Sequence, residues 1–515
     1  MKKDIINNQS NETVENVIVW LDFDTYAYIN FGIISALSKL AKFNFIGIVT
    51  TPQDLSFFQN QQNLPFKKLL YYPDCYVGKS TYDLDYLKNI EKKYELNIWL
   101  DIFAERSFYK YWIDFHKFTK DEILTIVGNT ITFFVDVFEK YQPKLILAQQ
   151  IGENISNILL YQIAKKTGIR ILMPNQVYMK NRITISDNLI SREISDAFKK
   201  SVNGFVNSSE IYDTEFIKKQ DRTESINILM NSPKFKQSRL HKISYYSKRL
   251  LHNPDPIYKD VEKTKLKMIK YRVQNGIETY KRKQFLDANS QISVKDAKFF
   301  YYPLVSEPEA RILANSPFCT NQLTLIENMA KSIPIDFVLY VKEHPVQKLK
   351  SWRPISYYKK IMDIPNVRLV HPSVSNRDLI EKSQGVIAIS GGTAFEAIFY
   401  KKPVILLADE YYDVLSMVTK NKTFDTLHSD IKNTLLNFKF NNTELNAFMQ
   451  AFNEQSLSIP YHSMITDGSI VSSVQKYERN YNLTMQYFLL FYEKYKNDFE
   501  LIARTIHSKL KIPQN

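Results

Sequence analysis

The chain has 515 residues, of which 44% are hydrophobic, and its net charge is +14, from 68 Lys and Arg against 54 Asp and Glu. This length predicts two domains, and the apolar content is sufficient for a packed core in each. The two cysteines, Cys75 and Cys319, lie far apart, which argues against a disulfide scaffold or a zinc cluster and suits a reducing cytoplasm. Residues 1–14 do not resemble a signal peptide, and no apolar run reaches the roughly 18–20 residues of a membrane span. We therefore expect a cytoplasmic protein that is soluble or bound peripherally to the inner face of the membrane.

The first domain is expected at residues 1–220, with a parallel sheet and helices between its strands. An apolar strand at 17–21 is followed by residues with helical spacing at 29–40 and by a second apolar strand at 45–50. This strand–helix–strand order is typical of a parallel sheet. A mainly helical segment and two further strands follow at 66–139, 144–150 and 168–175.

A basic helical linker is expected at residues 221–290. Between 233 and 285 the chain has 15 Lys and Arg against 4 Asp and Glu, a local excess of 11 positive charges. The segment is interpreted as a solvated linker or as a surface for anionic lipid or polymer, such as the inner membrane face. Nucleic acid is a third possible partner, but no zinc finger, RNA-recognition signature or basic zipper supports it, and we expect none.

The second domain is expected at residues 291–470, and C-terminal helices at 471–515 could pack back across the first domain. Short apolar strands alternate with helices in this domain, which predicts a parallel sheet covered on both faces. The expected strands are 298–303, 337–341, 367–370, 386–389 and 404–407, and the expected helices are 322–331, 376–382 and 394–400.

Three polar motifs follow strands of this second domain. They are Pro-Leu-Val-Ser-Glu-Pro-Glu at 303–309, Lys-Glu-His-Pro at 342–345 and Ser-Gly-Gly-Thr at 390–393. Ligands of α/β sheets bind at the carboxyl ends of strands, and a glycine turn before a helix offers backbone N–H groups to a phosphate. The alternatives are a tight turn without a ligand and, for Thr393 and Glu396, a helix capping box.

In order and spacing, these motifs resemble the capsule polysaccharide biosynthesis family of bacterial glycosyltransferases, which includes the Kdo transferases of capsule export systems. The resemblance covers roughly residues 299–410, and Val305 stands where the family usually has histidine, so no role of that histidine is carried over. It implies a GT-B-like fold, with two Rossmann-like α/β domains, a cleft between them, a helical linker and C-terminal helices. It also implies a nucleotide-sugar donor such as CMP-Kdo.

The donor is expected to lie against the motifs of the second domain. His344 can donate a hydrogen bond to a phosphate oxygen, Lys342 adds positive charge, and Glu343 can orient His344. Glu396 can accept from ribose hydroxyls. The predicted donor-binding residues are Lys342, Glu343, His344, Ser390, Gly391, Gly392, Thr393, Glu396 and Glu309.

Catalytic acid or base candidates follow the strands of the first domain, where an acceptor should bind. They are Asp22 and Glu153, with Asp24 beside them, and a plain surface carboxylate is the alternative for each. Asp22 and Asp24 also have the spacing of a metal-binding pair. We nevertheless expect no metal and no cofactor, because Lys, His and backbone N–H groups can neutralise a leaving phosphate.

The expected function is the transfer of a sugar from a nucleotide-sugar donor to a growing surface or capsular polysaccharide or its lipid-linked acceptor. Capsule assembly or export proteins are further expected partners. One alternative is a CDP-glycerol-type glycerophosphotransferase of teichoic-acid-like polymers, whose usual Asp-Tyr-Ser-Ser-type turn fits residues 390–393 poorly. The other is a non-catalytic glycan-binding protein of an assembly.

Overall fold

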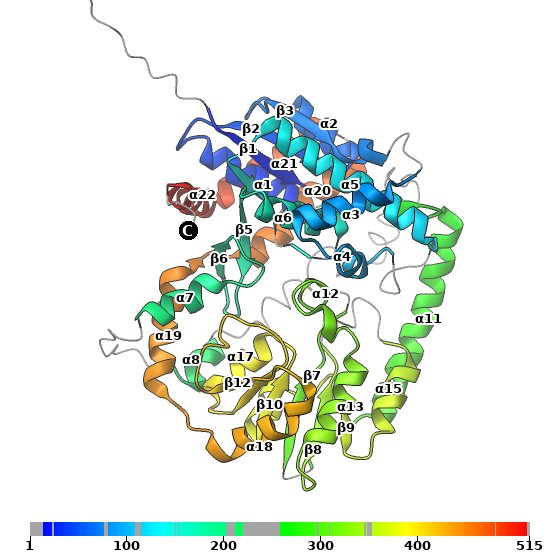
Figure 1. The fold of residues 1–515 in the computed structure, drawn as a ribbon, viewed down its shortest axis with the longest axis vertical. Helices are drawn as coiled ribbons and strands as arrows, with labels where there is room; N and C mark the ends of the chain where they lie inside the picture. The colour runs from blue at the N-terminus through cyan, green and yellow to red at the C-terminus, as the bar shows by residue number, and fades with distance from the viewer. Residues whose placement is uncertain are drawn as a thin grey trace, which may run out of the picture.

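The chain forms two α/β domains, one above the other in Figure 1, and each is built around its own sheet. Two α/β domains with parallel sheets are what the alternation of strands and helices predicts, so the expected fold class is confirmed. The structure is a computed structural model and describes residues 14–22, 25–76, 81–108, 115–149, 151–152, 154–201, 212–219, 258–295, 298–307, 309–344, 347, 353–478 and 480–511.

The first domain contains a seven-stranded sheet with the order β13-β6-β5-β4-β1-β2-β3. Strands β1 to β5 run parallel, and β6 and β13 form an antiparallel edge. Three of these strands, β3, β6 and β13, were not predicted, since they are short or lie toward the sheet edges with mixed polar sequences. The strands are β1 (Asn16–Leu21), β2 (Asn44–Val49), β3 (Lys68–Tyr71), β4 (Leu145–Leu147), β5 (Arg170–Gln176), β6 (Arg182–Ser186) and β13 (Leu457–Ser458).

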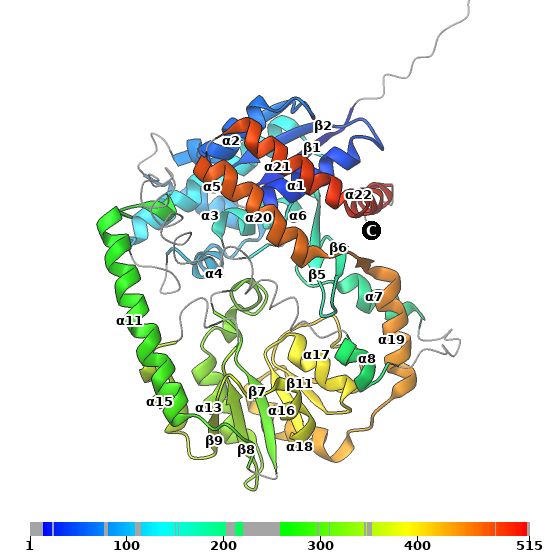
Figure 2. The same ribbon diagram turned by 180° about the vertical axis from the view of Figure 1, so that it is seen from behind.

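Helices cover both faces of this sheet, as the opposite views of Figures 1 and 2 show in turn. Successive side chains of a strand point to opposite faces. In β1, Val17 and Val19 therefore pack into one apolar core and Ile18 and Trp20 into another. The first core contains α1 (Thr25–Leu37), α2 (Pro52–Asn60), α20 (Tyr461–Glu478), α21 (Tyr481–Lys494) and α22 (Lys496–Leu510). The second contains α3 (Leu84–Tyr94), α4 (Ile98–Ala104), α5 (Lys120–Tyr141) and α6 (Ile155–Lys166).

The second domain contains a six-stranded, all-parallel sheet with the order β12-β11-β10-β7-β8-β9. Its strands are β7 (Phe299–Pro303), β8 (Val338–Lys342), β9 (Val367–Val370), β10 (Gly385–Ala388), β11 (Val404–Leu406) and β12 (Val418–Lys420). One face is covered by α13 (Gln322–Ser332), α15 (Ile355–Met362) and α18 (Leu427–Asn437), and the other by α16 (Asn376–Lys382) and α17 (Gly392–Phe399).

The C-terminal part of the chain returns to the first domain. Helix α19 (Asn442–Gln455) packs on α7 (Arg192–Ser201), and both contribute to the apolar core of the second sheet. Strand β13 then joins the first sheet, and α20 and α22 pack on α1. The expected boundary at residue 470 falls inside α20, whereas the chain has already re-entered the first domain at residue 457. Ser456, Ser458 and Pro460 could have marked a break there, but only the strand pairing shows that the chain re-enters the first sheet at this point.

The expected linker at 221–290 is described from residue 258 onward. It contains a 3-10 turn, η2 (Tyr258–Asp260), and the 25-residue helix α11 (Lys265–Asn289). Figures 1 and 2 both show α11 along one edge of the molecule, running from the level of the first domain to that of the second.

Candidate active site

The three motifs meet at one edge of the second sheet. Strand β7 pairs in parallel with β10 on one side and with β8 on the other. Residues 303–307, 342–344 and 390–393 end or follow these three neighbouring strands, so they lie at the carboxyl edge, where α/β sheets bind ligands. This edge contacts the first domain, because Tyr178, beyond β5, hydrogen-bonds Glu410, beyond β11.

Lys342 ends β8 and is almost fully buried. Its Nζ donates to Oδ1 of Asn376, the first residue of α16, at 2.6 Å, and the Tyr301 hydroxyl donates to the same oxygen at 3.0 Å. Burial lowers the pKa of Lys342 to about 8, and the charge of Glu396 opposes this shift. The ammonium group is therefore poised to gain from a nearby phosphate, whose charge would raise its pKa.

Glu343 points to the opposite face of the sheet and is fully buried in an ion pair with Arg353. Its second oxygen accepts from the Tyr358 hydroxyl at 2.7 Å, and its first oxygen also accepts from the His344 N–H at 2.8 Å. Both carboxylate oxygens of Glu343 are thus used inside the domain, and one of them holds the backbone N–H of His344, as the expected orienting role requires. The predicted contact of Glu343 with the donor stays a prediction.

Arg353 connects this motif to the first one. Its guanidinium donates to the Val305 carbonyl at 2.7 Å and pairs with Glu307 at 3.2 Å. The loop after β7 is held further by Gln347, whose Oε1 accepts from the Glu307 N–H at 3.1 Å. Motifs that are forty residues apart in the sequence are thus fixed to one another by a single buried cation.

His344 follows directly and is half-buried. Its N–H is held by Glu343, and its carbonyl accepts from the Gln347 N–H at 2.9 Å. Both bonds fix the backbone of His344 at the carboxyl edge of the sheet, and the predicted contact of its imidazole with a phosphate stays a prediction.

The Ser-Gly-Gly-Thr turn connects β10 to α17. Gly391 is the N-cap of α17 with φ 118°, a left-handed conformation that disfavours side chains. Its N–H donates to Glu410 at 2.9 Å, and its carbonyl accepts from the Tyr412 hydroxyl at 2.8 Å. Gly391 therefore supplies the bend, while Gly392 and Thr393 place their N–H groups in the first helical turn, where intrahelical acceptors are lacking.

The capping-box alternative for Thr393 and Glu396 is wrong. The helix begins at Gly392, so Thr393 lies inside it, and no side chain caps it. Glu396 instead acts on Lys342 and Tyr301, because its negative charge raises the pKa of both groups. Glu396 is therefore on the same side of the sheet as the contact of these two residues with Asn376.

Glu309 lies at the junction of the domains. It is the N-cap of α12 (Ala310–Leu313), which contacts α4 of the first domain. Burial lowers the pKa of Arg106 to about 10, and the nearby Glu105 and Glu309 carboxylates oppose the shift. The junction is close: a Cβ at Gly152 would lie 2.7 Å from the Cβ of Ala314. Glu309 thus faces the first domain.

The predicted catalytic carboxylates lie at the first sheet or outside the described residues. Asp22 follows β1, is buried, and accepts from the Thr50 hydroxyl at 2.7 Å. Glu153 and Asp24 lie outside the described residues. Within the described part of the chain, no group of three or more His, Cys, Asp or Glu side chains could hold a metal ion.

Sequence reasoning missed the groups that organise this edge from outside the motifs: Asn376, Arg353, Tyr178 and Glu410. The sequence analysis placed Asn376 only in a helix. Its position could have identified it as a site residue, because it is the first residue of α16, the helix that follows β9, and β9 lies next to β8 in the sheet. The other three carry no local pattern, because their partners lie at distant positions in the chain.

Comparison with known proteins supports the resemblance stated above. Residues 213–447 match the model of the family described as capsule polysaccharide biosynthesis protein, and this region contains all three motifs. The predicted resemblance is therefore confirmed over that region. No curated protein matches the chain.

Solved structures show only distant likeness. UDP-GlcNAc 2-epimerase from Methanocaldococcus jannaschii is 13% identical over 85% of this chain and 99% of its own, with a TM-score of 0.24. Thermosulfurimonas dismutans KpsC, in structures of its beta Kdo 2,7 transferase and beta Kdo 2,4 transferase, is 14% and 10% identical. These two cover 61% of this chain and 78% and 85% of their own, with TM-scores of 0.30 and 0.32. Scores this low carry no inference about the site, whose interpretation rests on its own geometry.

Proposed function

We propose that this protein is a glycosyltransferase of surface polysaccharide synthesis that holds a nucleotide-sugar donor at the carboxyl edge of its second sheet. The observation that carries the proposal is the meeting of residues 303–309, 342–344 and 390–393 at the ends of three adjacent parallel strands. The family match over residues 213–447 supports a polysaccharide as the product.

The edge offers positive charge and hydrogen-bond donors for a leaving phosphate. In the transfer, the acceptor oxygen forms a bond to the anomeric carbon while the bond from that carbon to the donor phosphate breaks. Negative charge grows on the phosphate, and Lys342, His344 and the first-turn N–H groups of α17 are placed to stabilise it. No metal is needed in this scheme, which remains our proposal.

The acceptor hydroxyl must also lose its proton to a base. Asp22 is proposed for this role, because it follows β1 of the domain opposite the donor. Its hydrogen bond from Thr50 would hold the carboxylate in place while it accepts the proton.

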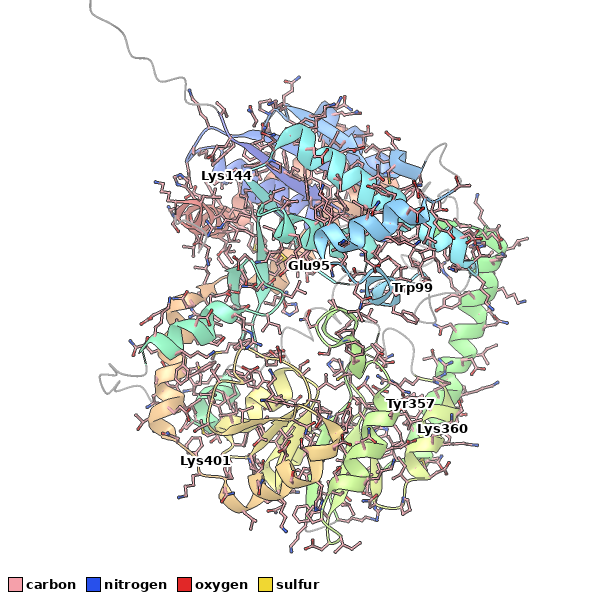
Figure 3. All side chains as sticks on the ribbon, viewed as in Figure 1. Glu95, Trp99, Lys144, Tyr357, Lys360 and Lys401 are labelled. Atoms are coloured by element: carbon pink, nitrogen blue, oxygen red, sulfur yellow. The ribbon has the colours of Figure 1, made fainter. Side chains whose placement is uncertain are left out.

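Exposed aromatic side chains support an acceptor site at the domain junction. Trp99 of α4 is 47% exposed and lies on the side of the first domain that faces the second (Figure 3). Phe318, in the 3-10 turn η3 (Pro317–Cys319) that contacts α4, is 86% exposed. Apolar faces of sugar rings can pack on such rings, and we propose that the glycan acceptor does so.

A thermal-shift panel tests the proposal and its alternatives. Ligands that bind the folded state raise the melting temperature. CMP, CMP-sugars, UDP-sugars, CDP-glycerol and acidic glycans would be compared, each with and without EDTA. A shift by a nucleotide or its sugar, unchanged by EDTA, is expected. A shift by CDP-glycerol alone would favour the glycerophosphotransferase, and a shift by glycans alone would favour the non-catalytic protein.

A further inference from the structure

Helix α11 presents an apolar stripe to solvent. Five large side chains recur at intervals of three or four residues, so they lie on one face of the helix. From residue 266 to residue 280 there are fourteen steps along the helix, so the stripe is about 21 Å long at 1.5 Å per residue. Its members are Leu266, Ile269, Val273, Ile277 and Tyr280, which are 79, 44, 58, 51 and 62% exposed.

The opposite face of α11 is the one that contacts the protein. Leu286 is buried, and the Tyr271 ring lies 6.2 Å from the Phe115 ring of the first domain. Lys267 donates to the Phe115 carbonyl at 3.1 Å. The stripe is therefore turned away from the domains, along the edge of the molecule that Figures 1 and 2 show α11 to occupy.

Lysines border the stripe on both sides. At 100° per residue, Lys265 and Lys283 lie along one border, and Lys270 and Lys281 lie along the other. The helix as a whole carries seven Lys and Arg against two Asp and Glu. A long apolar stripe between two rows of positive charge is the pattern of a helix that lies in the surface of a membrane.

We propose that α11 docks the protein onto a membrane that contains anionic lipid, with the stripe at the boundary of headgroups and acyl chains. The bordering lysines would then meet anionic headgroups, which attract basic residues near the surface. This inference goes beyond the transfer reaction and does not depend on it. None of the described helices is apolar and long enough to cross a membrane, so the proposed contact is with the surface alone.

A second copy of the chain fits the stripe less well. If two α11 helices paired along their stripes, the bordering residues would face one another. In an antiparallel pair, each border would face the same border of the partner helix, so Lys270 would lie near the partner's Lys281. In a parallel pair, Lys270 would face the opposite border, which carries Lys265 and Lys283. Lys281 and Lys283 each pair with a carboxylate of their own helix, at 3.5 and 2.7 Å, but Lys265 and Lys270 would still face lysine borders in both cases. Anionic lipid instead attracts the lysines of both borders.

The test is sedimentation of the full chain with vesicles of phosphatidylcholine alone and of phosphatidylcholine mixed with phosphatidylglycerol, at low and high salt. We expect binding to the anionic vesicles that weakens with salt. The stripe variant, Leu266→Gln with Val273→Gln and Ile277→Gln, is expected to lose it. Changing Lys265, Lys270, Lys281 and Lys283 to Gln should weaken it by about five-fold for each lysine.

Matched controls remove equally exposed groups elsewhere. Ile335→Gln with Leu436→Gln changes residues that are 105% and 72% exposed, and should leave binding unchanged. An environment-sensitive dye on Val273→Cys should shift to the blue with anionic vesicles, and a dye on the neighbouring Gln274→Cys, outside the stripe, should shift less.

Several results would overturn the proposal. They are absence of binding to anionic vesicles, equal binding to neutral vesicles, or full binding by the stripe variant. A dimer in sedimentation velocity that the stripe variant abolishes would assign the stripe to a second copy instead.

Discussion

Arg353 and Glu343 form an ion pair from which solvent is excluded, with side chains 4% and 0% exposed. Their positions are separated by the His-Pro motif, and the same guanidinium reaches Val305 and Glu307 of the preceding motif. A buried pair of this kind fixes geometry more than it adds stability, because desolvation offsets most of the attraction. Its effect here is to hold two loops of the candidate active site in register.

Arg353→Met is predicted to destabilise the second domain. Removing one partner leaves the Glu343 carboxylate buried without its cation, which costs about 3–5 kcal/mol of unfolding free energy. Lys298→Met is the control, since its pair with Asp336 is about half exposed and is worth less than about 1 kcal/mol. Denaturant unfolding of both variants checks this, and equal losses would refute the importance of the buried pair.

His344→Ala is predicted to reduce transfer while the fold survives. Loss of one preorganised donor to a developing anion costs on the order of 10²–10³ in kcat. His371→Ala is a matched control: it also precedes a proline after a strand, but its ring contacts Ser373 at 2.5 Å and Asp287 at 3.1 Å on the surface. Wild-type turnover by His344→Ala, or an equal loss in the control, would remove His344 from the site.

Nucleotide affinity is predicted to fall as the pH rises through about 8. The pKa of Lys342 is lowered to about 8 by burial, so the free protein loses this positive charge above that pH, and anionic ligands lose a partner. Titration of the tightest nucleotide on either side of pH 8 measures the effect. Lys342→Arg keeps its charge and should flatten the dependence, and an unchanged slope in that variant would contradict the assignment.

Asp101→Asn is predicted to stabilise the protein above pH 7. Burial raises the pKa of Asp101 to about 7, and its Oδ1 accepts from Gln162 at 2.8 Å. Because the folded pKa exceeds the ordinary value, the folded state binds the proton more tightly, and wild-type stability declines as the pH rises from about 4 to 7. The free energy of unfolding of the variant should therefore exceed that of the wild type by on the order of a few kcal/mol above pH 7, and this difference should vanish near pH 4. Thermal unfolding at both pH values measures it.

Trp99→Ala is predicted to raise the KM for the glycan acceptor and leave nucleotide affinity unchanged. The side chain is half exposed on α4, so its loss should not unfold the domain. Leu84→Ala, which is 50% exposed on another helix of the same domain, serves as the control. A change in nucleotide affinity alone would place Trp99 on the donor side instead.

The sequence by itself determined five of the six strands of the second domain, all but the short edge strand β12, and the position of the motifs at the strand ends. Runs such as 338–341 and 385–388 have no charged residue, because a parallel sheet between two helical layers buries both faces. The helix predicted at 376–382 has the observed bounds, because the pattern that predicts a helix is also local in the sequence. Once the strands are parallel, their polar ends must share one edge, so the motifs could be placed together without coordinates.

Only the tertiary structure decided which neighbour each polar group meets. Lys342 and Glu343 are adjacent, yet one reaches Asn376 and the other Arg353 on opposite faces of the sheet. The N–H of Gly391 meets Glu410, and the apolar side chains of α11 turn outward rather than toward the domains. These contacts join residues that are distant in the sequence or depend on which side of a helix is covered, and local sequence patterns carry no information about either.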